Sequence, residues 1–481
     1  MAPFRTYGYL LMNWAAVGEA TPQGPPNSGG AGRIVRGLAA NIGGMGITLV
    51  IQLVSVPVLL VAWGLPKYGE WLVLSAVPTY VALSDLTFSA VAGNSMVMLE
   101  AAGKHEEAVA LGGHLWSIVT IMTGITVLAA VAIAFAFGGV FGSGAAIPAS
   151  EAQIVLAALF LQVAVGNQYG VLDAWYRAGG RYPLSAIVRQ LGRIFEFGAL
   201  MGAVLLGAGP GTAAIAFLTG SVAGFGVSWI VLHRAVPWAT FRPERPHVQT
   251  FRELLAHGLA FMAFPMGNAL SLQGFTIVIG ATLGAPAVVV FAATRTMTRV
   301  ALQAMGSINN AIWPELSRSM GSGRLDEARA ILRHSVQLAL AAALALVLGL
   351  SLFGVAIIRR WTHGMVDPPV QLLFILLLVI VANSMWFTLS AVLAATNRHP
   401  RMAVVYLSGT TAALLGAVPL SSAFGLTGAA TALLAIDIAM IAYVLPAALR
   451  VVEDAPVHFL RALLDVPGTI RLAISRVRPA A

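Results

Sequence analysis

The sequence predicts an all-α polytopic membrane protein, and three observations lead to this fold class. Hydrophobic residues make up 58% of the 481 positions, charged residues only 10%, and the mean hydropathy is +0.84. The apolar residues form long runs, and most cations lie in the short segments between them. Soluble domains do not have this composition, whereas a bilayer imposes it. The net charge of +9 therefore does not indicate a nucleic-acid partner.

Twelve apolar runs are long enough to cross a hydrocarbon core, which takes about 20 helical residues. The first six cover residues 37–62, 69–96, 110–138, 151–176, 184–207 and 211–232. The other six cover residues 254–282, 286–313, 329–358, 369–396, 403–424 and 426–449. The sequence thus predicts about 12 transmembrane helices in two six-helix lobes.

The expected domains follow from this grouping. They are a disordered tail (1–36), an N-lobe (37–232), a polar linker (233–253), a C-lobe (254–449) and an amphipathic tail at the inner membrane surface (450–481). The Pro/Gly/Ser-rich stretch TPQGPPNSGGAG favours disorder in the first segment. A cleaved signal peptide is the alternative, with the apolar stretch YLLMNWAAV as its core.

The distribution of Lys and Arg predicts the orientation in the membrane. With both termini in the cytoplasm, 21 of the 28 cations lie in cytoplasmic segments, three lie outside and four lie within spans. Because cytoplasmic loops retain positive charge, we expect a multi-pass protein of a bacterial cytoplasmic membrane with both ends inside.

Short motifs recur between the two groups of helices at a nearly constant displacement along the chain. Gly64-Leu65-Pro66 matches Gly284-Ala285-Pro286, and the loop GKHEEA matches GRLDEA at the same displacement. Arg181-Tyr182-Pro183 matches Arg398-His399-Pro400 at a slightly shorter one. Each match marks the same loop on the same side of the membrane, which predicts a parallel pseudo-repeat with a central cavity between the lobes.

Two arginines in the eighth predicted helix are the strongest functional signal. Arg295 and Arg299 share one helix face, ~13 Å and ~20 Å beyond Pro286, near the middle of a core about 30 Å thick. An arginine there costs about 2.5–3.5 kcal/mol and needs a counter-charge, water or an anionic ligand. The repeat places Ser75 and Thr79 at the equivalent positions, so packing alone does not require arginine. A structural pairing with a carboxylate such as Asp85 is the alternative.

Other polar residues within the spans complete the candidate substrate site. The set consists of Arg295, Arg299, Arg193, Asp85, Gln303, Asn41, Gln52 and Tyr169. Hydrogen bonding between helices is the alternative for the uncharged members. An intrahelical pair with Glu196 is the alternative for Arg193. Asp437 is a second deep carboxylate, and whether it, Arg189 or Arg193 faces the cavity is left open.

Metal and cofactor chemistry are not expected. The chain has no cysteine, its nine histidines lack metal-ligand spacing, and no phosphate-binding glycine loop is present. We therefore predict no catalytic residue, no metal and no cofactor, with an ion gradient or the membrane potential as the energy source.

Two stretches resemble a known family. They are GLAANIGGMGITLVIQLVSVPVLLVAWGLPKYGEWLVLSAVPTYVALSDL and RTMTRVALQAMGSINNAIWPELSRSMGSGRLDEAR. Both are similar to polysaccharide-biosynthesis flippases, of the Wzx-like O-antigen type, in the multidrug/oligosaccharidyl-lipid/polysaccharide exporter superfamily. The resemblance covers about residues 33–449 and implies a MATE-like fold with alternating access. Asp85-Leu86-Thr87 departs from the Asp-Leu-Gly of many relatives.

The resemblance implies an undecaprenyl-pyrophosphate-linked oligosaccharide as the cargo, moved from the inner to the outer leaflet. Residue chemistry agrees, because arginine binds phosphate oxygens through paired donors. We hypothesise that Arg295 and Arg299, helped by Arg193, hold the pyrophosphate. Membrane lipids, a polysaccharide polymerase and glycosyltransferases are the expected partners. The alternatives are a cation-coupled multidrug exporter and a membrane enzyme acting on lipid-linked sugars; the outside loops are too short for the latter.

Overall fold

The computed structural model describes residues 28–82, 86–141, 146–242 and 262–464, and within these ranges it contains helices and no strand. The helices described in the first half of the chain are α2 (Ser28–Ala82), α3 (Leu86–Ala101), α4 (His105–Phe141), α5 (Ala149–Ala178), α6 (Tyr182–Leu205) and α7 (Pro210–Ala235). Helix α2 begins at Ser28, inside the segment that we expected to be a disordered tail, and the predicted second span is divided between α2 and α3.

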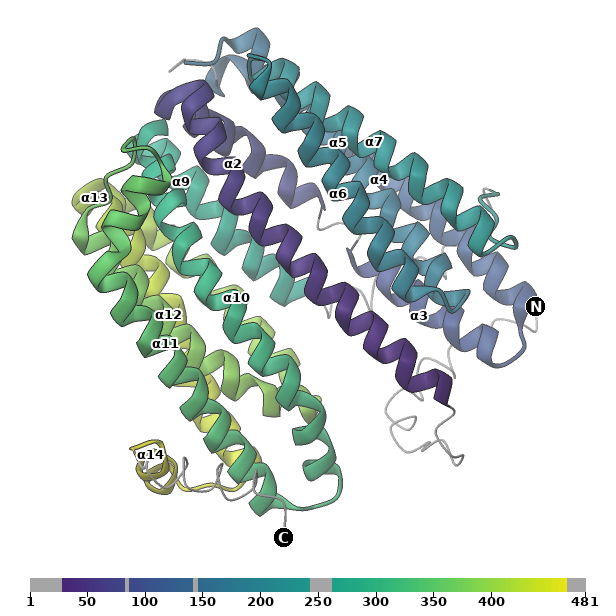
Figure 1. Cartoon of the computed structure of the whole chain (residues 1–481), viewed down its shortest axis with the longest axis vertical. Coiled ribbons are helices and arrows are strands. Elements are labelled where there is room, and N and C mark those ends of the chain that lie inside the picture. Colours follow the sequence, from purple (N-terminus) through teal and green to yellow (C-terminus); the bar gives the residue numbers. More distant parts are fainter. Residues whose placement is uncertain (1–27, 83–85, 142–145, 243–261, 465–481) are drawn as a thin grey trace.

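The second half of the chain begins with a helix over residues 262–283, which includes the π-helix η3 (Leu270–Gly274) and α9 (Phe275–Leu283). The helices that follow are α10 (Ala285–Gly321), α11 (Leu325–Trp361), α12 (Val370–Ala395), α13 (His399–Val451) and α14 (Pro456–Leu464). Figure 1 shows the two halves as two adjacent helical bundles.

Eight helices among the described residues are long and apolar enough to cross a membrane. Two of them contain more than one predicted span, because α2 bends at Gly64 and α13 bends at Gly425. Helices α6 and α10, which carry the intramembrane arginines, are not among the eight, although they have 24 and 37 residues. The all-α polytopic membrane fold is confirmed.

The parallel repeat is visible in the backbone. Left-handed residues occur in pairs at nearly the same displacement along the chain: Gly64 and Gly284, Gly103 and Gly323, Gly180 and Asn397, Gly207 and Gly425. Gly64 (φ 69°, ψ 175°) and Gly284 (φ 83°, ψ 170°) even share their ψ region, which is almost closed to residues with a Cβ. The repeated sequence motif that begins at Gly64 and at Gly284 therefore has the same backbone conformation in both halves.

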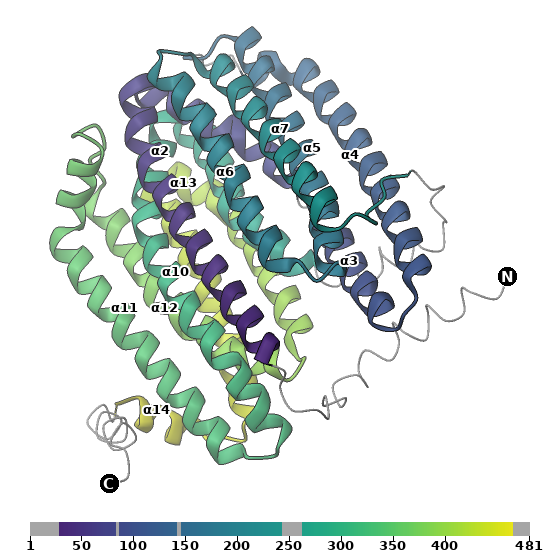
Figure 2. The same cartoon turned by 45° about the vertical axis from the view of Figure 1, so that its right-hand side comes forward.

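We name the two ends of the molecule by their connections. The upper end of Figure 1 contains the α9–α10 connection and the bend of α2, and the lower end contains the α10–α11 connection. Helix α2 lies between the bundles, with α6 on one side and α10 on the other (Figure 2). It therefore forms a large part of the contact between the two halves.

Close contacts between the halves lie at the upper end. A Cβ on Gly69 of α2 would lie 2.0 Å from the carbonyl oxygen of Ala285, and one on Gly280 would lie 2.6 Å from Val73. The Trp361 indole donates to the Leu53 carbonyl over 2.7 Å. Only glycine permits so close a backbone approach at position 69.

Polar bonds join α11 to the last described helix and to the connection that precedes it. Arg333 forms a two-pronged ion pair with Asp454, Arg329 donates to the Val452 carbonyl over 2.8 Å, and Gln337 donates to the Ala462 carbonyl. Phe459 of α14 is fully buried, while Val457 and Leu460 on the same helix are exposed. This amphipathic helix is the described part of the predicted surface tail.

Replacing Gly69 with Val should push the halves apart at the upper end, because its Cβ meets backbone atoms that cannot rotate away. Overpacking of this kind costs about 1–3 kcal/mol. We expect a lower Tm in detergent than for Gly124→Val, since nothing lies within 4 Å of a Cβ on Gly124. Equal melting temperatures for the two variants would contradict the close contact.

Candidate functional site

Arg295 is held inside the second half by a widened turn of the neighbouring helix. Its guanidinium donates to the Ser271 carbonyl over 2.8 Å and to the Ser271 hydroxyl over 3.0 Å. Ser271 belongs to η3, and π-type turns inside helices are frequently found at functional sites. The rings of Phe275 and Phe291 lie 6.0 Å and 5.8 Å from the guanidinium carbon. Backbone, hydroxyl and aromatic faces thus replace part of the arginine's hydration.

Asp437 of α13 is the carboxylate of the same region. It is only 5% exposed, and its Oδ1 accepts hydrogen bonds from the Asn383 amide over 2.9 Å and from the Trp386 indole over 2.7 Å. No ion pair joins Asp437 to an arginine of the described chain. The two hydrogen-bond donors that hold the Asp437 carboxylate are therefore both neutral.

Arg295, Arg299 and Asp437 line one small cavity of ≈ 100 Å³ in the second half. Its polar wall is completed by Asn268, Ser271, Thr298, Asn383 and Tyr406. Two guanidinium groups face one carboxylate, so the described lining has a net charge of +1. A buried excess of positive charge favours an anionic ligand or water. The volume corresponds to a few water molecules, since each occupies about 30 Å³ in the liquid.

Two of the predicted site residues meet between the halves. The Gln303 amide of α10 donates to the Gln52 side-chain oxygen of α2 over 3.4 Å. This bond links the arginine-bearing helix of the second half to the first helix of the first half. The side chain of Asn41 and all of Asp85 lie outside the described residues, so the predictions for them stay untested.

The arginines of α6 have different environments. Arg193 is exposed and donates to the Thr48 hydroxyl of α2 over 2.8 Å. Its suggested partner Glu196 accepts a hydrogen bond from Ser221 over 2.8 Å, and no ion pair joins Glu196 to Arg193 in the described part of the chain. Arg189 lies 5.9 Å from the centre of the Tyr169 ring and lines a separate cavity.

That cavity lies in the first half and has a volume of ≈ 450 Å³. Its polar lining includes Gln162, Asn167 and Gln190. Asp173 there is neutralised by Arg177 at 2.7 Å and also accepts a bond from Ser185 at 2.5 Å. Arg189 adds a second cation, so Arg177 and Arg189 against Asp173 give this lining a net charge of +1, and its amide groups can bind sugar hydroxyls.

Tyr169 does not line either cavity. It is 7% exposed, and its hydroxyl packs where a Cβ on Gly192 or Gly224 would lie within 2.6 Å or 2.8 Å. The Tyr169 ring meets Phe225 edge to face, with the ring centres 5.4 Å apart. Tyr169 thus packs among α5, α6 and α7, and its role in substrate binding stays a prediction.

Solved structures share this fold. An inward-facing multidrug resistance MATE family transporter of the MOP superfamily has a TM-score of 0.66 and 17% identity, covering 84% of this chain and 98% of its own. The lipid II flippase MurJ in an inward closed conformation has a TM-score of 0.65 and 14% identity, covering 92% and 94%. The chain therefore has the fold of these transporters. An outward-facing MATE transporter of the same superfamily has a TM-score of 0.55 and 17% identity, covering 87% and 95%.

Sequence comparison adds nothing to this likeness. No protein-family model matches the chain, and no curated protein matches it. At such low identity the structural likeness concerns the fold alone, and the site has to be interpreted from its own residues.

Sequence reasoning missed four polar residues of the arginine cavity: Asn268, Ser271, Thr298 and Tyr406. The signal was weak, because a single Ser or Tyr in an apolar span is most often a partner for a neighbouring helix. Only the packing of η3 against α10 and α13 reveals that Ser271 binds Arg295 and that Tyr406 lines the same cavity.

Replacing Asp437 with Ala should destabilise the second half, since the buried amide of Asn383 and indole of Trp386 would both lose their acceptor. An unsatisfied buried donor costs about 1–3 kcal/mol. Asp437→Asn keeps an acceptor oxygen and should melt at a higher temperature than Asp437→Ala. A Tm for the Ala variant equal to or above that of the Asn variant would contradict this hydrogen-bond arrangement.

Proposed function

We propose that the protein is a transporter that moves an undecaprenyl-pyrophosphate-linked oligosaccharide from the inner to the outer leaflet by alternating access. The observation that carries the proposal is the pair Arg295 and Arg299, which line one cavity in the membrane-spanning part of the chain with a single carboxylate opposite them. The cargo would serve the synthesis of O-antigen, capsule or exopolysaccharide, with polymerase and glycosyltransferases as partners.

A pyrophosphate matches the chemistry of this cavity. Guanidinium groups bind phosphate oxygens through paired, charge-assisted hydrogen bonds and are weakly hydrated, so they suit a site away from water. The described lining has an excess of one positive charge, which an anionic head group would neutralise. Ser271 already orients Arg295 through two bonds, which lowers the entropic cost of binding.

The sugars need a different space. The arginine cavity, at ≈ 100 Å³, is too small for an oligosaccharide, since ligand sites typically have about 300–1,000 Å³. The first-half cavity of ≈ 450 Å³ lies within that range and offers amide groups from Gln162, Asn167 and Gln190. In this proposal the pyrophosphate binds to the second half, the sugars lie toward the first half, and the lipid tail stays in the bilayer.

The contacts between the halves suggest how access alternates. The excess of Lys and Arg at the lower end supports a cytoplasmic location for that end. The contacts of Gly69 with Ala285 and of Trp361 with Leu53 then close the outer side. Outward opening would break these contacts. The hydrogen bond between Gln303 and Gln52 would join the two halves at the level of the cargo.

A multidrug exporter driven by a cation gradient is the second candidate. The observation in its favour is Asp437, a buried carboxylate in the cavity, together with the fold shared with MATE transporters. The two arginines oppose this function, because they repel the cationic drugs that an acidic site would bind. Asp437 fits better as a coupling group for cargo transport.

The double variant Arg295→Gln/Arg299→Gln tests the function in a reconstituted leaflet-translocation assay with a defined lipid-linked sugar. Each arginine–phosphate bond is worth about 1.5–3 kcal/mol, so losing two should slow translocation roughly 100-fold or more. Protein level and Tm are measured alongside.

The matched control is Arg318→Gln/Arg324→Gln, which removes the same charge from the lower end. Both residues are exposed and paired with Glu315 and Glu327, and such surface pairs contribute little. Normal translocation by the Arg295→Gln/Arg299→Gln protein would overturn the proposed function.

A further inference from the structure

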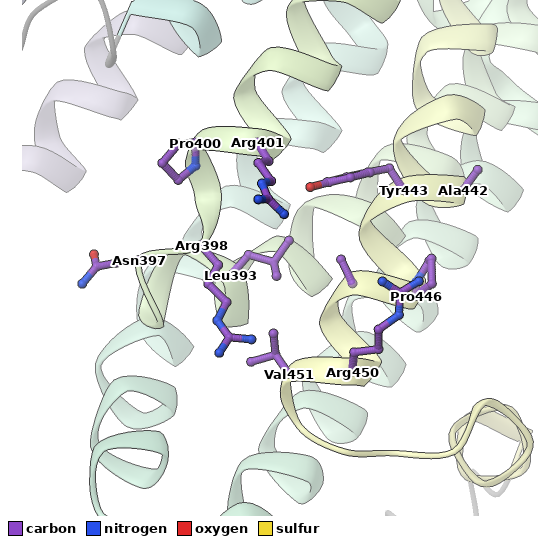
Figure 3. A pocket seen from close by; sticks show the side chains of 11 residues that line it. Leu393, Asn397, Arg398, Pro400, Arg401, Ala442, Tyr443, Pro446, Arg450 and Val451 are labelled. Carbon is purple, nitrogen blue, oxygen red and sulfur yellow. The ribbon is translucent and has the colours of Figure 1, made fainter. Parts of the chain in front are cut away.

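A second cationic cavity, remote from Arg295, lies at the lower end between the two arms of α13. It has a volume of ≈ 740 Å³. Arg398, at the amino end of this helix, and Arg401 in its first turn come from one arm, and Arg450 comes from the other (Figure 3). Figure 3 shows the three side chains around the same opening, with the Tyr443 hydroxyl directed toward Arg401.

These three arginines differ from their neighbours in having no acidic partner among the described residues. At the same end Arg318, Arg324 and Arg333 each form an ion pair, with Glu315, Glu327 and Asp454. No described carboxylate forms an ion pair with Arg398, Arg401 or Arg450, and no acidic residue is among the residues that line the cavity. Three cations around one cavity without a counter-charge favour an anion there.

The repeat shows that the fold does not require the charge of Arg401. The matching loop of the first half, Arg181-Tyr182-Pro183, supplies one arginine. Leu184, the residue after this loop, occupies the position equivalent to Arg401, which follows Pro400. The second cation of the loop is therefore particular to the second half, as Arg295 and Arg299 are.

Apart from Asn397 and Tyr443, the rest of the lining is apolar, and it continues toward exposed apolar residues of the same helix. Leu393, Ala442, Pro446 and Val451 form part of its wall. Ile438, one helical turn before Ala442, is 56% exposed, and Val404, one turn after Arg401, is 60% exposed. A ligand that fills this space must carry a negative head and an apolar chain.

We propose that the cavity between the arms of α13 binds the phosphate group of an acidic membrane lipid. The three guanidinium groups would hold the phosphate oxygens, and the acyl or prenyl chain would follow the apolar surface past Ala442 and Ile438. The ligand class is a lipid phosphate, whose source is a bulk phospholipid or the lipid carrier of the cargo. The proposal goes beyond the proposed function and does not depend on what the protein transports.

Native mass spectrometry of the purified full chain, delipidated and titrated with lipid in detergent, tests the proposal. The probes are phosphatidylglycerol, undecaprenyl phosphate, phosphatidylcholine and inorganic phosphate. We expect both anionic lipids to bind more tightly than phosphatidylcholine, whose head group has no net charge. Arg398→Gln/Arg401→Gln/Arg450→Gln should weaken their binding at least about tenfold, since each arginine near a membrane surface adds roughly fivefold. A preference for undecaprenyl phosphate over phosphatidylglycerol that disappears in this triple variant would identify the carrier as the source, and tighter binding of phosphatidylglycerol would identify bulk lipid.

The control Arg181→Gln/Arg234→Gln/Arg242→Gln removes the same charge from exposed positions of the first half and should bind both anionic lipids normally. Ala442→Trp fills the cavity without changing charge and should also lose binding, which covers the possibility that the triple variant misfolds. An equal loss of lipid binding in the control, or unchanged lipid binding in Ala442→Trp, would overturn the proposal. Binding of inorganic phosphate without binding of either anionic lipid would overturn it as well. Because these variants leave Arg295 and Arg299 in place, this result is separate from the test of the cargo.

Discussion

The architecture depends on keeping two guanidinium groups charged inside a membrane-spanning bundle. An arginine at that depth costs about 2.5–3.5 kcal/mol unless its environment offsets the loss of water. The second half does so for Arg295 with the carbonyl and hydroxyl of Ser271, two aromatic faces and a carboxylate across the cavity. The π-helix η3 and the buried Asp437 thus both belong to the surroundings of Arg295.

The internal repeat shows what was added to a shared scaffold. Bends at Gly64 and Gly284 match, yet the helices that follow them differ in charge. Ser75 and Thr79 in the first half bond to carbonyls of their own helix, over 3.0 Å and 3.1 Å, and need no partner elsewhere. Arg295, at the equivalent position to Ser75, reaches across to another helix. The second half thus lines its cavity with Arg295 and Arg299 opposite Asp437, while most polar residues that line the first-half cavity are uncharged.

The fold was largely predictable because its rules are local. Span length follows from bilayer thickness, and the glycine motifs at 64 and 284 specify bends that other residues disfavour. The arginines were predictable because charge in a span is costly. Their partners were not, since Ser271 and Tyr406 look like ordinary polar residues until three helices are packed together. The surroundings of Tyr169 were hidden for a related reason: helical spacing predicts a stripe of polar residues, but only packing shows that its ring lies against glycines of two neighbouring helices.

The most direct test of the central claim is equilibrium binding of undecaprenyl pyrophosphate and of undecaprenol to the purified protein. The two lipids share the chain and differ in the anionic head. If Arg295 and Arg299 hold a pyrophosphate, the diphosphate should bind the native protein more tightly than the alcohol by roughly 100-fold, and the difference should largely disappear in Arg295→Gln/Arg299→Gln. Equal affinity for the two lipids in the native protein, or an unchanged preference in the variant, would contradict the account.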